Sequence, residues 1–340
     1  MVTNSDWTTP GVYEVVPGVY RIPLPLPNDG LRAVNVYAIT GDHGPVLIDS
    51  GWGIQQSRDL LRDGLAELGA EVSDIAHFLI THVHNDHYSQ AIHVRRETGV
   101  RVTLGAQERY SLELARRLSG SPIAEMTNPL IALGANELLE EFRAKVGRPD
   151  ASDLELPDDW SNNGDLFQAN GRTLETVETP GHTRGHVVFY DNDAALLFAG
   201  DHVLPTITPS IGFEPARVHN PLGDFLNSLA IVRARPDAML LPAHGHVTAS
   251  VHTRVDELVE HHRVRLDTMA AVMGEGADTA WEVAGKVTWT RHERVLSDLD
   301  IFNKYLATCE TGAHLELMVS QDRATVKEVD GVRHYCLVAS

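Results

Sequence analysis

Cysteine and long apolar runs are scarce in this 340-residue chain. With only Cys309 and Cys336, at most one disulfide can form, and we expect both residues to be reduced, buried thiols. No stretch approaches the roughly 18 apolar residues of a membrane span. The polar segment Met1–Pro10 contains no apolar signal-peptide core. These absences predict a cytoplasmic protein that does not insert into a membrane.

Positive charge is also in short supply, and this limits the partners of the protein. The chain has 28 Lys and Arg residues against 47 Asp and Glu residues, a net charge of −19. Such a charge opposes binding to nucleic acid or to anionic lipid, so we expect a small-molecule substrate. Apolar residues make up 43% of the chain, which is ample for a sizeable core, and the length favours two domains.

Histidine, by contrast, is abundant, and its clustering gives the first indication of chemistry. His82, His84, Asp86 and His87 fall within six residues, directly after the apolar run 75–80. That run predicts a buried strand ending in a polar loop. Residues two apart in an extended segment point the same way, whereas the last two turn into a following helix. Imidazole and carboxylate are the usual ligands of zinc, so this spacing favours a two-metal site over a histidine-rich surface loop.

Up to residue 104 the chain alternates predicted strands with predicted helices. The strands are expected at 12–22, 34–39, 45–48, 75–80 and 100–104, and the helices at 55–68 and 91–98. Asp49 directly follows one of these strands. It either orients a ligand histidine from behind or caps the next helix.

The section 106–165 breaks this alternation. Helical spacing predicts helices at 108–118 and 129–146, and residues 149–164 are expected to be irregular. An insertion of this length is typical of a lid or substrate wall, with a dimerisation element as the alternative. Its apolar residues either pack the insert onto the core or line a pocket: Met126, Pro129, Leu130, Ile131 and Leu133.

Three later strands end in a histidine or an aspartate that follows small, turn-forming residues. Glycine at such places lets the backbone approach a metal closely. The repeated pattern of strand, turn and ligand is a stronger signal than any single member. The residues are His182 after strand 174–178, Asp201 after hairpin 187–198, and His244 after strand 238–241.

In this order, from about Leu47 to His246, these motifs resemble the metallo-β-lactamase superfamily of binuclear metallohydrolases, with a glyoxalase-II-like set of ligands. The resemblance implies an α/β fold, a four-layer αββα sandwich with the site at one edge of its two sheets. It also implies two Zn²⁺ ions per chain, although the same ligand types accept manganese or iron. The implied ligands are His82, His84 and His182 for the first metal and Asp86, His87 and His244 for the second, with Asp201 bridging.

The resemblance further implies a metal-bridging hydroxide as the nucleophile, which Asp86 would orient while it helps to move protons to the leaving group. His186 is a candidate for contact with a ligand or with substrate, and a structural role is the alternative. Tyr88 either donates to a developing oxyanion or packs in the core. Ser89-Gln90 stand where many members have Gly-Gly, so we expect a changed pocket floor with ligation retained.

Residues 1–253 are therefore predicted to form the catalytic domain, with the helical insert at about 106–165, and residues 254–340 a C-terminal domain. Its helices are expected at 254–273, 279–287 and 298–311 and its strands at 315–320, 324–329 and 332–337, the last two joined by the turn Asp330-Gly331. This order resembles the winged-helix tail of some lactamase-like proteins, including a group of endoribonucleases.

The C-terminal domain, however, has the wrong charge for a nucleic-acid reader. It holds 10 Lys and Arg residues against 15 Asp and Glu residues, a net charge of −5. A nucleic-acid reader should present a basic face, so we expect a structural cap or a homodimerisation module. His219, His261 and His262 are expected to be ordinary surface or helix residues.

The leading functional hypothesis is a binuclear zinc-dependent hydrolase of an acyl substrate. A thioester, either an acyl-CoA or a glutathione thioester, is favoured, and a related ester or lactone would use the same machinery. The alternative is an endoribonuclease or phosphodiesterase of the winged-helix group. A β-lactamase ranks lower because we expect no export signal, and a non-enzymatic metal-bound scaffold also ranks lower.

Overall fold

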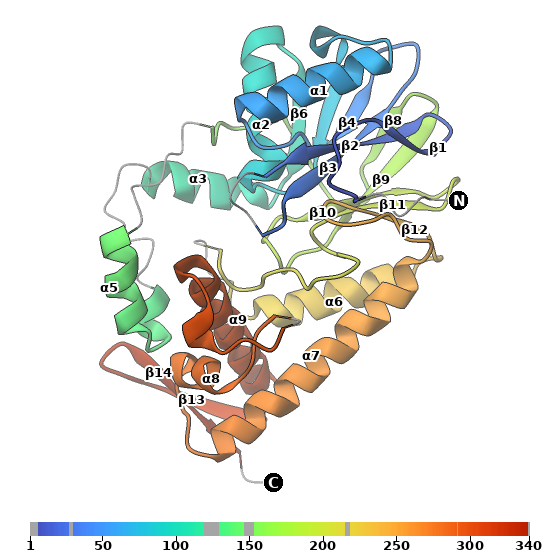
Figure 1. Cartoon of the computed structure of the whole chain (residues 1–340). Coiled ribbons are helices and arrows are strands. Elements are labelled where there is room, and N and C mark those ends of the chain that lie inside the picture. Colours follow the sequence, from blue (N-terminus) through green and yellow to red (C-terminus); the bar gives the residue numbers. More distant parts are fainter. Residues whose placement is uncertain are drawn as a thin grey trace. The chain divides into compact units, whose positions relative to one another are not determined.

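The computed structural model describes residues 6–26, 30–118, 129–145, 153–214, 218–290 and 292–338 (Figure 1). The chain divides into two compact units. The first comprises Met1–Glu113, Ser152–Pro209 and Ser228–Val255, and the second comprises Leu114–Ala151, Ser210–Asn227 and Asp256–Ser340. The division of the chain into domains at residues 253 and 254 stays a prediction.

A seven-stranded sheet in the first unit has the order β1-β2-β3-β4-β5-β6-β7. Strands β1 to β4 pair antiparallel, and β4 to β7 pair parallel. Because parallel strands end at one edge, β4 delivers Asp49 and β5 delivers His82 to the same place. The strands are Tyr13–Val16, Val19–Pro25, Ala33–Ile39, Val46–Ile48, His77–Ile80, Arg101–Gly105 and Asp159–Ser161.

A five-stranded sheet in the same unit has the order β12-β11-β10-β9-β8. The pair β11–β12 is parallel, and the other pairs are antiparallel. Strands β9, β11 and β12 therefore run in one direction, and the chain segments that follow them carry His182, Asp201 and His244. The strands β8 to β12 are Leu166–Ala169, Arg172–Glu178, Val187–Asp191, Leu196–Gly200 and Met239–Pro242.

Two apolar clusters hold the layers of this unit together. One lies where helices α1 (Gln55–Glu67) and α2 (Asn85–Thr98) cover the seven-stranded sheet, with Leu61 of α1 and Tyr88 of α2 among its members (Figure 1). The other lies between the sheets, where Tyr37 of β3 meets Phe198 of β11 edge to face at 5.5 Å. This layering confirms the predicted α/β class.

The second unit is mainly helical. After the 3₁₀ turn η2 (Leu296–Asp298), helix α9 begins with the side chain of Asp300 as its N-cap, and the chain ends in a hairpin of two strands. Helices α3, α6 and α7 cross the unit boundaries. The order of three helices and a hairpin agrees with the prediction, while the winged-helix assignment stays a prediction. The elements are α3 (Glu108–Leu118), α5 (Asn136–Lys145), α6 (Pro221–Arg233), α7 (Val251–Gly274), α8 (Ala280–Lys286), α9 (Ile301–Ser320), β13 (Ala324–Val329) and β14 (Val332–Leu337).

One predicted element was wrong, and two others were correct only in part. Residues 315–320 form the last turns of α9 and not a strand. Residues 311–318 are all buried, so this part of the helix has no polar face. Without a polar face, the sequence does not show the helical period of hydrophobic residues. The predicted helix 129–146 breaks at Gly134, whose φ of 77° is left-handed. Within the stretch expected to be irregular, 159–161 forms β7 because it pairs with β6.

The cysteines and the apolar residues of the insert can also be placed. Both cysteines are free, but only Cys309 is buried; Cys336 is exposed on an edge of the two-stranded sheet, which corrects the expectation for it. Leu130 and Leu133 are buried, as packing of the insert requires, and Met126 lies outside the described residues. In the part of the chain that the structure describes, no helix is both long and apolar enough to cross a membrane.

Candidate metal centre

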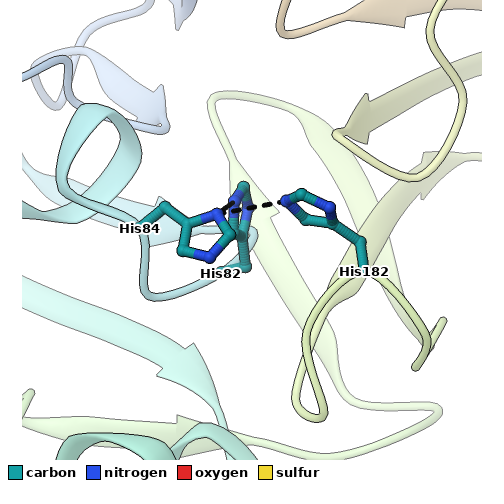
Figure 2. Close-up of side chains that lie close together, drawn as sticks. All are labelled: His82, His84 and His182. Atoms are coloured by element: carbon teal, nitrogen blue, oxygen red, sulfur yellow. Dashed lines mark hydrogen bonds between the residues drawn. The ribbon is translucent and has the colours of Figure 1, made fainter. Parts of the chain in front are cut away.

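Three histidine nitrogens converge at the edge where the two sheets end. His84 Nδ1 lies 2.9 Å from His82 Nε2 and 3.1 Å from His182 Nε2 (Figure 2). Nitrogen ligands about 2.0 Å from a tetrahedral zinc ion lie about 3.3 Å apart, close to these separations. The three residues predicted to hold the first metal are thus gathered into one group of the size that a metal needs.

The hydrogen bonds of Thr81 determine which nitrogen of His82 is available. The Thr81 hydroxyl donates to the Asp49 carboxylate at 2.9 Å, so it accepts from His82 Nδ1 at 3.1 Å. The lone pair of His82 therefore lies on Nε2, on the side of the cluster. Burial lowers the pKa of His82 well below its usual range, and burial with the neighbouring His182 lowers the pKa of His84 to about 3. Both rings are neutral at physiological pH, as metal ligands must be.

A second group consists of Asp86, His87 and His244. One oxygen of Asp86 lies 3.5 Å from His87 Nε2 and 3.4 Å from His244 Nε2. Asp201 links the two groups, because Oδ1 lies 3.3 Å from His244 Nε2 while Oδ2 lies 3.5 Å from His182 Nε2. The structure thus brings all seven predicted ligand residues together, and their roles as ligands stay predictions.

Three buried atoms of this centre lack a hydrogen-bond partner among the described residues: His87 Nε2, His244 Nε2 and Asp201 Oδ1. The opposite nitrogens of the two rings are engaged, since His87 Nδ1 donates to Asp49 at 2.8 Å and His244 Nδ1 to the Ala33 carbonyl at 2.7 Å. Nε2 of each ring therefore points into the centre, where Asp201 Oδ1 also lies. Buried polar atoms rarely stay unpaired, and a cation is the group that such donors surround, so the residues present fit a metal.

The charges of the second group reinforce this fit. Burial opposes ionisation of Asp86 and Asp201, but the adjacent His87 and His244 hold the pKa of both carboxyls below the usual range. Burial likewise lowers the pKa of His244, but Asp201 and Asp86 outweigh it and raise that pKa to about 10. Burial also lowers the pKa of His87, but the nearby carboxylates, Asp86 and Asp201 among them, outweigh it and raise that pKa well above its usual value. In the metal-free chain His87 and His244 therefore each carry a second proton at neutral pH, and a cation bound at Nε2 would replace it.

Asp49 connects this centre to the end of β4. Its φ of 61° is left-handed, a conformation that aspartate tolerates better than most residues. Its carboxylate accepts from the Thr81 backbone N–H at 2.8 Å as well as from His87. The N-cap of α1 is Ile54, so of the two predicted roles the structure places Asp49 behind a histidine of the centre.

His186 and Tyr88 hold neighbouring backbone segments. His186 Nε2 accepts from the backbone N–H of Asp201 at 3.1 Å, and its Nδ1 donates to the Thr179 hydroxyl at 2.9 Å. The buried Tyr88 donates its hydroxyl to the Glu155 carbonyl at 2.6 Å. His186 thus fixes Asp201 from behind, and Tyr88 adopts the packing alternative.

The sequence interpretation missed the residues that support the His182 loop. A Cβ on Gly185 would lie only 2.1 Å from the backbone nitrogen of Glu108, so the loop touches the start of α3 backbone to backbone. The Thr183 hydroxyl donates to the buried Glu108 carboxylate at the same contact. No sequence motif indicates a role for Glu108. The one sequence feature that could have indicated this contact is the glycine at position 185.

Replacing Asp49 with Asn tests how the centre is oriented. Asparagine keeps the shape and tolerates the left-handed backbone, but its amide NH₂ can face His87 Nδ1 and force the ring proton onto Nε2. That tautomer cannot bind a cation through Nε2. We expect Asp49→Asn to weaken zinc binding about 10- to 100-fold in competition with a chromophoric chelator. The exposed Asp42→Asn is the control, and equal affinities of the two variants would contradict this role.

Proton release tests the charge balance of the second group. Because the pKa of His244 is about 10 and that of His87 is also raised, both rings carry protons below that pH, and these compete with a cation. Zinc affinity should therefore rise with pH from 6 to 8, with the release of about two protons per chain at pH 7. Calorimetry in buffers of different ionisation enthalpy measures the count, and His244→Gln should lower it by about one. Heats that do not depend on the buffer would refute the prediction.

Known proteins resemble both the sequence and the fold. A probable metallo-hydrolase of Bacillus subtilis is 22% identical over 90% of this chain and 92% of its own length. A lactamase-like protein of Emericella nidulans is 26% identical over 78% of this chain and 68% of its own. A crystal structure of a metallo-beta-lactamase family protein from Thermus thermophilus superimposes with a TM-score of 0.76 at 29% identity, covering 96% of this chain and all of that one.

A beta-lactamase domain protein from Burkholderia ambifaria has the same fold, with a TM-score of 0.79 at 24% identity over 96% of this chain and 94% of that one. The model of the metallo-beta-lactamase superfamily matches residues 29–244, which include every residue of both histidine groups. All three kinds of evidence indicate the same family: the two sheets, the converging strand ends and the similarity to known proteins. The chain belongs to the metallo-beta-lactamase superfamily of metal-dependent hydrolases.

Proposed function

We propose that this metal-dependent hydrolase is a zinc enzyme that cleaves thioesters, with an acyl-CoA or a glutathione thioester as substrate. His82, His84 and His182 would hold one zinc ion, and Asp86, His87 and His244 the other, with Asp201 between them. When bound, the two ions would activate a water molecule as the nucleophile and polarise the substrate carbonyl. Imidazole and carboxylate ligands also accept manganese and iron, so elemental analysis of the purified protein belongs to the first experiment.

The observation that carries the proposal is the position of Asp86 and Asp201, each beside His87 or His244 at 3.3 to 3.5 Å. His87 and His244 hold the pKa of both carboxyls below the usual range in spite of their burial. Both carboxyls are therefore ionised at neutral pH and have no proton of their own to donate. The only proton that Asp86 could pass to a leaving group is one that it has first accepted from the attacking water.

A leaving group that is stable as an anion suits such a site. A thiol has a pKa of about 8.5, so a thiolate departs without full protonation. The alkoxide of an ester, lactone or phosphodiester, and the amine of an amide, depend much more on a general acid. The chemistry of the two carboxylates thus favours a thioester within the hydrolase class.

Cleavage of RNA is the second candidate, because the order of three helices and a hairpin agrees with the predicted tail. The charge opposes it: residues 254–340 carry a net charge of −5, and the whole chain −19. Binding to a polyanion requires Lys and Arg side chains that neutralise phosphates. An acyl thioester carries fewer phosphates than RNA, so its binding requires fewer Lys and Arg side chains.

The decisive experiment compares matched substrates on zinc-loaded protein. Acyl-CoA and S-acylglutathione thioesters are assayed beside oxygen esters and lactones of the same acyl groups, a β-lactam and single-stranded RNA. We expect kcat/KM for the best thioester to exceed that of its oxygen ester by at least about tenfold. Faster cleavage of RNA or of the β-lactam, or no cleavage of any thioester, would refute the proposal.

Asp86→Asn separates enzymatic turnover from a contaminant. Loss of the proton acceptor should lower kcat about 10²- to 10⁴-fold. Zinc content is measured on the same sample, because a loss of metal would also lower kcat. The exposed Asp42→Asn is the matched control and should retain the activity of the unmodified chain.

A further inference from the structure

A second group of metal-ligating side chains lies in the second unit, away from the sequence motifs of the hydrolase centre. His261 and His262 are consecutive residues of α7, and Glu310 lies in α9. One ligand atom of each lies within 4.8 Å of the other two. None of these residues is needed for the proposed hydrolysis, so the group requires its own explanation.

A chain of hydrogen bonds assigns the proton on His262. His314 Nδ1 lies 2.8 Å from the backbone carbonyl of Glu310, which can only accept, so Nδ1 carries the proton and Nε2 the lone pair. That lone pair lies 3.2 Å from His262 Nδ1, which must therefore be the donor. The remaining nitrogen of His262, Nε2, is left with its lone pair unprotonated.

This last lone pair has no partner. His262 and His314 both have 0% of their surface exposed, and His262 Nε2 makes no hydrogen bond among the described residues. A pair of histidines that only joined α7 to α9 would explain the contact between the rings but not the unpaired atom. Metal-ligating histidines characteristically donate their other ring N–H to an acceptor, as His262 does to His314.

We propose that His261, His262 and Glu310 bind one divalent transition-metal ion, with His262 as a ligand through Nε2. Two imidazoles and one carboxylate form a donor set that suits zinc or ferrous iron and leaves positions open for water. Ligand atoms of a zinc site lie about 3.3 Å apart, so the group must contract on binding. His261 is exposed and can turn to do so, whereas the hydrogen bond to His314 holds His262 in place.

Glu310 would contribute twice to this site. Its backbone carbonyl fixes the tautomer of His314 and, through it, that of His262, while its side chain supplies the carboxylate ligand. The ion would join α7 to α9 inside the second unit, and we expect it to stabilise that unit. His261 and His262 both lie in α7, as the expectation of helix residues requires, and His262 is in addition buried and hydrogen-bonded to a second histidine.

Metal content of the full chain tests the site. The purified protein and its variants are dialysed to equilibrium against zinc, and bound zinc per chain is measured by elemental analysis. We expect His261→Ala and Glu310→Gln each to bind one zinc ion fewer than the unmodified chain. The controls are His219→Ala and Glu260→Gln, which remove an exposed histidine and an exposed glutamate of the same unit and should lose none.

A second measurement guards against misfolding and against loose surface binding. His261 is exposed, so His261→Ala should keep the circular dichroism spectrum of the unmodified chain while it loses the ion. Thermal unfolding in zinc should give a smaller zinc-dependent rise in Tm for this variant than for His219→Ala. The proposal is overturned if both variants bind as much zinc as the controls, or if all four lose zinc equally. Either result leaves the hydrolase centre unaffected, because its residues are unchanged.

Discussion

The hydrogen bond from His87 to Asp49 is the contact on which the hydrolase centre depends. Asp49 stands just past β4 with a left-handed backbone, and His87 lies in the first turn of α2, so one bond of 2.8 Å ties the end of a strand to the start of a helix. The other oxygen of Asp49 accepts from the Thr81 backbone at the end of β5. One carboxylate thus fixes three chain segments at a single edge of the sheet.

The contact between Asp49 and His87 also determines which ring nitrogens of the histidines point into the centre. Asp49 accepts hydrogen bonds from both the Thr81 hydroxyl and His87 Nδ1, so the Thr81 hydroxyl accepts from His82 Nδ1, and His82 keeps its lone pair on Nε2. His87 also directs Nε2 at the centre, and His244 does so through the hydrogen bond of its Nδ1 to the Ala33 carbonyl. In the metal-free chain the raised pKa of His87 and His244 leaves a proton on each Nε2, beside the ionised Asp86 and Asp201. A cation would replace these protons among the same atoms, so the arrangement fits a metal centre.

The sequence predicted the centre better than it predicted its surroundings. His82, His84 and His87 could be found because a strict spacing at a strand end is a local signal, and His182, Asp201 and His244 repeat it. The sequence did not reveal the supporting residues Glu108, Thr179 and Thr183, because their roles arise from contacts between segments far apart in the chain. The strand at 159–161 and the helix at 315–320 were misassigned for a related reason: pairing with β6 and burial on all sides of α9 outweigh local composition. His262 was expected to be an ordinary residue because its hydrogen bond to His314, 52 residues away, could not be predicted from local sequence.

The charge pattern connects this centre to its proposed chemistry. Carboxyls held ionised by adjacent histidines have no proton of their own to supply, and for this reason we propose a leaving group as stable as a thiolate. The family model and the relatives show the hydrolase class, and cleavage of a thioester within that class is our proposal.

Two metal ions in the centre of the first unit are the prediction on which the proposed function most depends. Anomalous diffraction at the zinc edge from crystals of the zinc-loaded chain locates these ions without reference to any substrate. We expect two peaks there, one beside His82, His84 and His182 and the other beside Asp86, His87 and His244, with Asp201 between them. A single peak, or peaks away from these seven residues, would contradict this prediction.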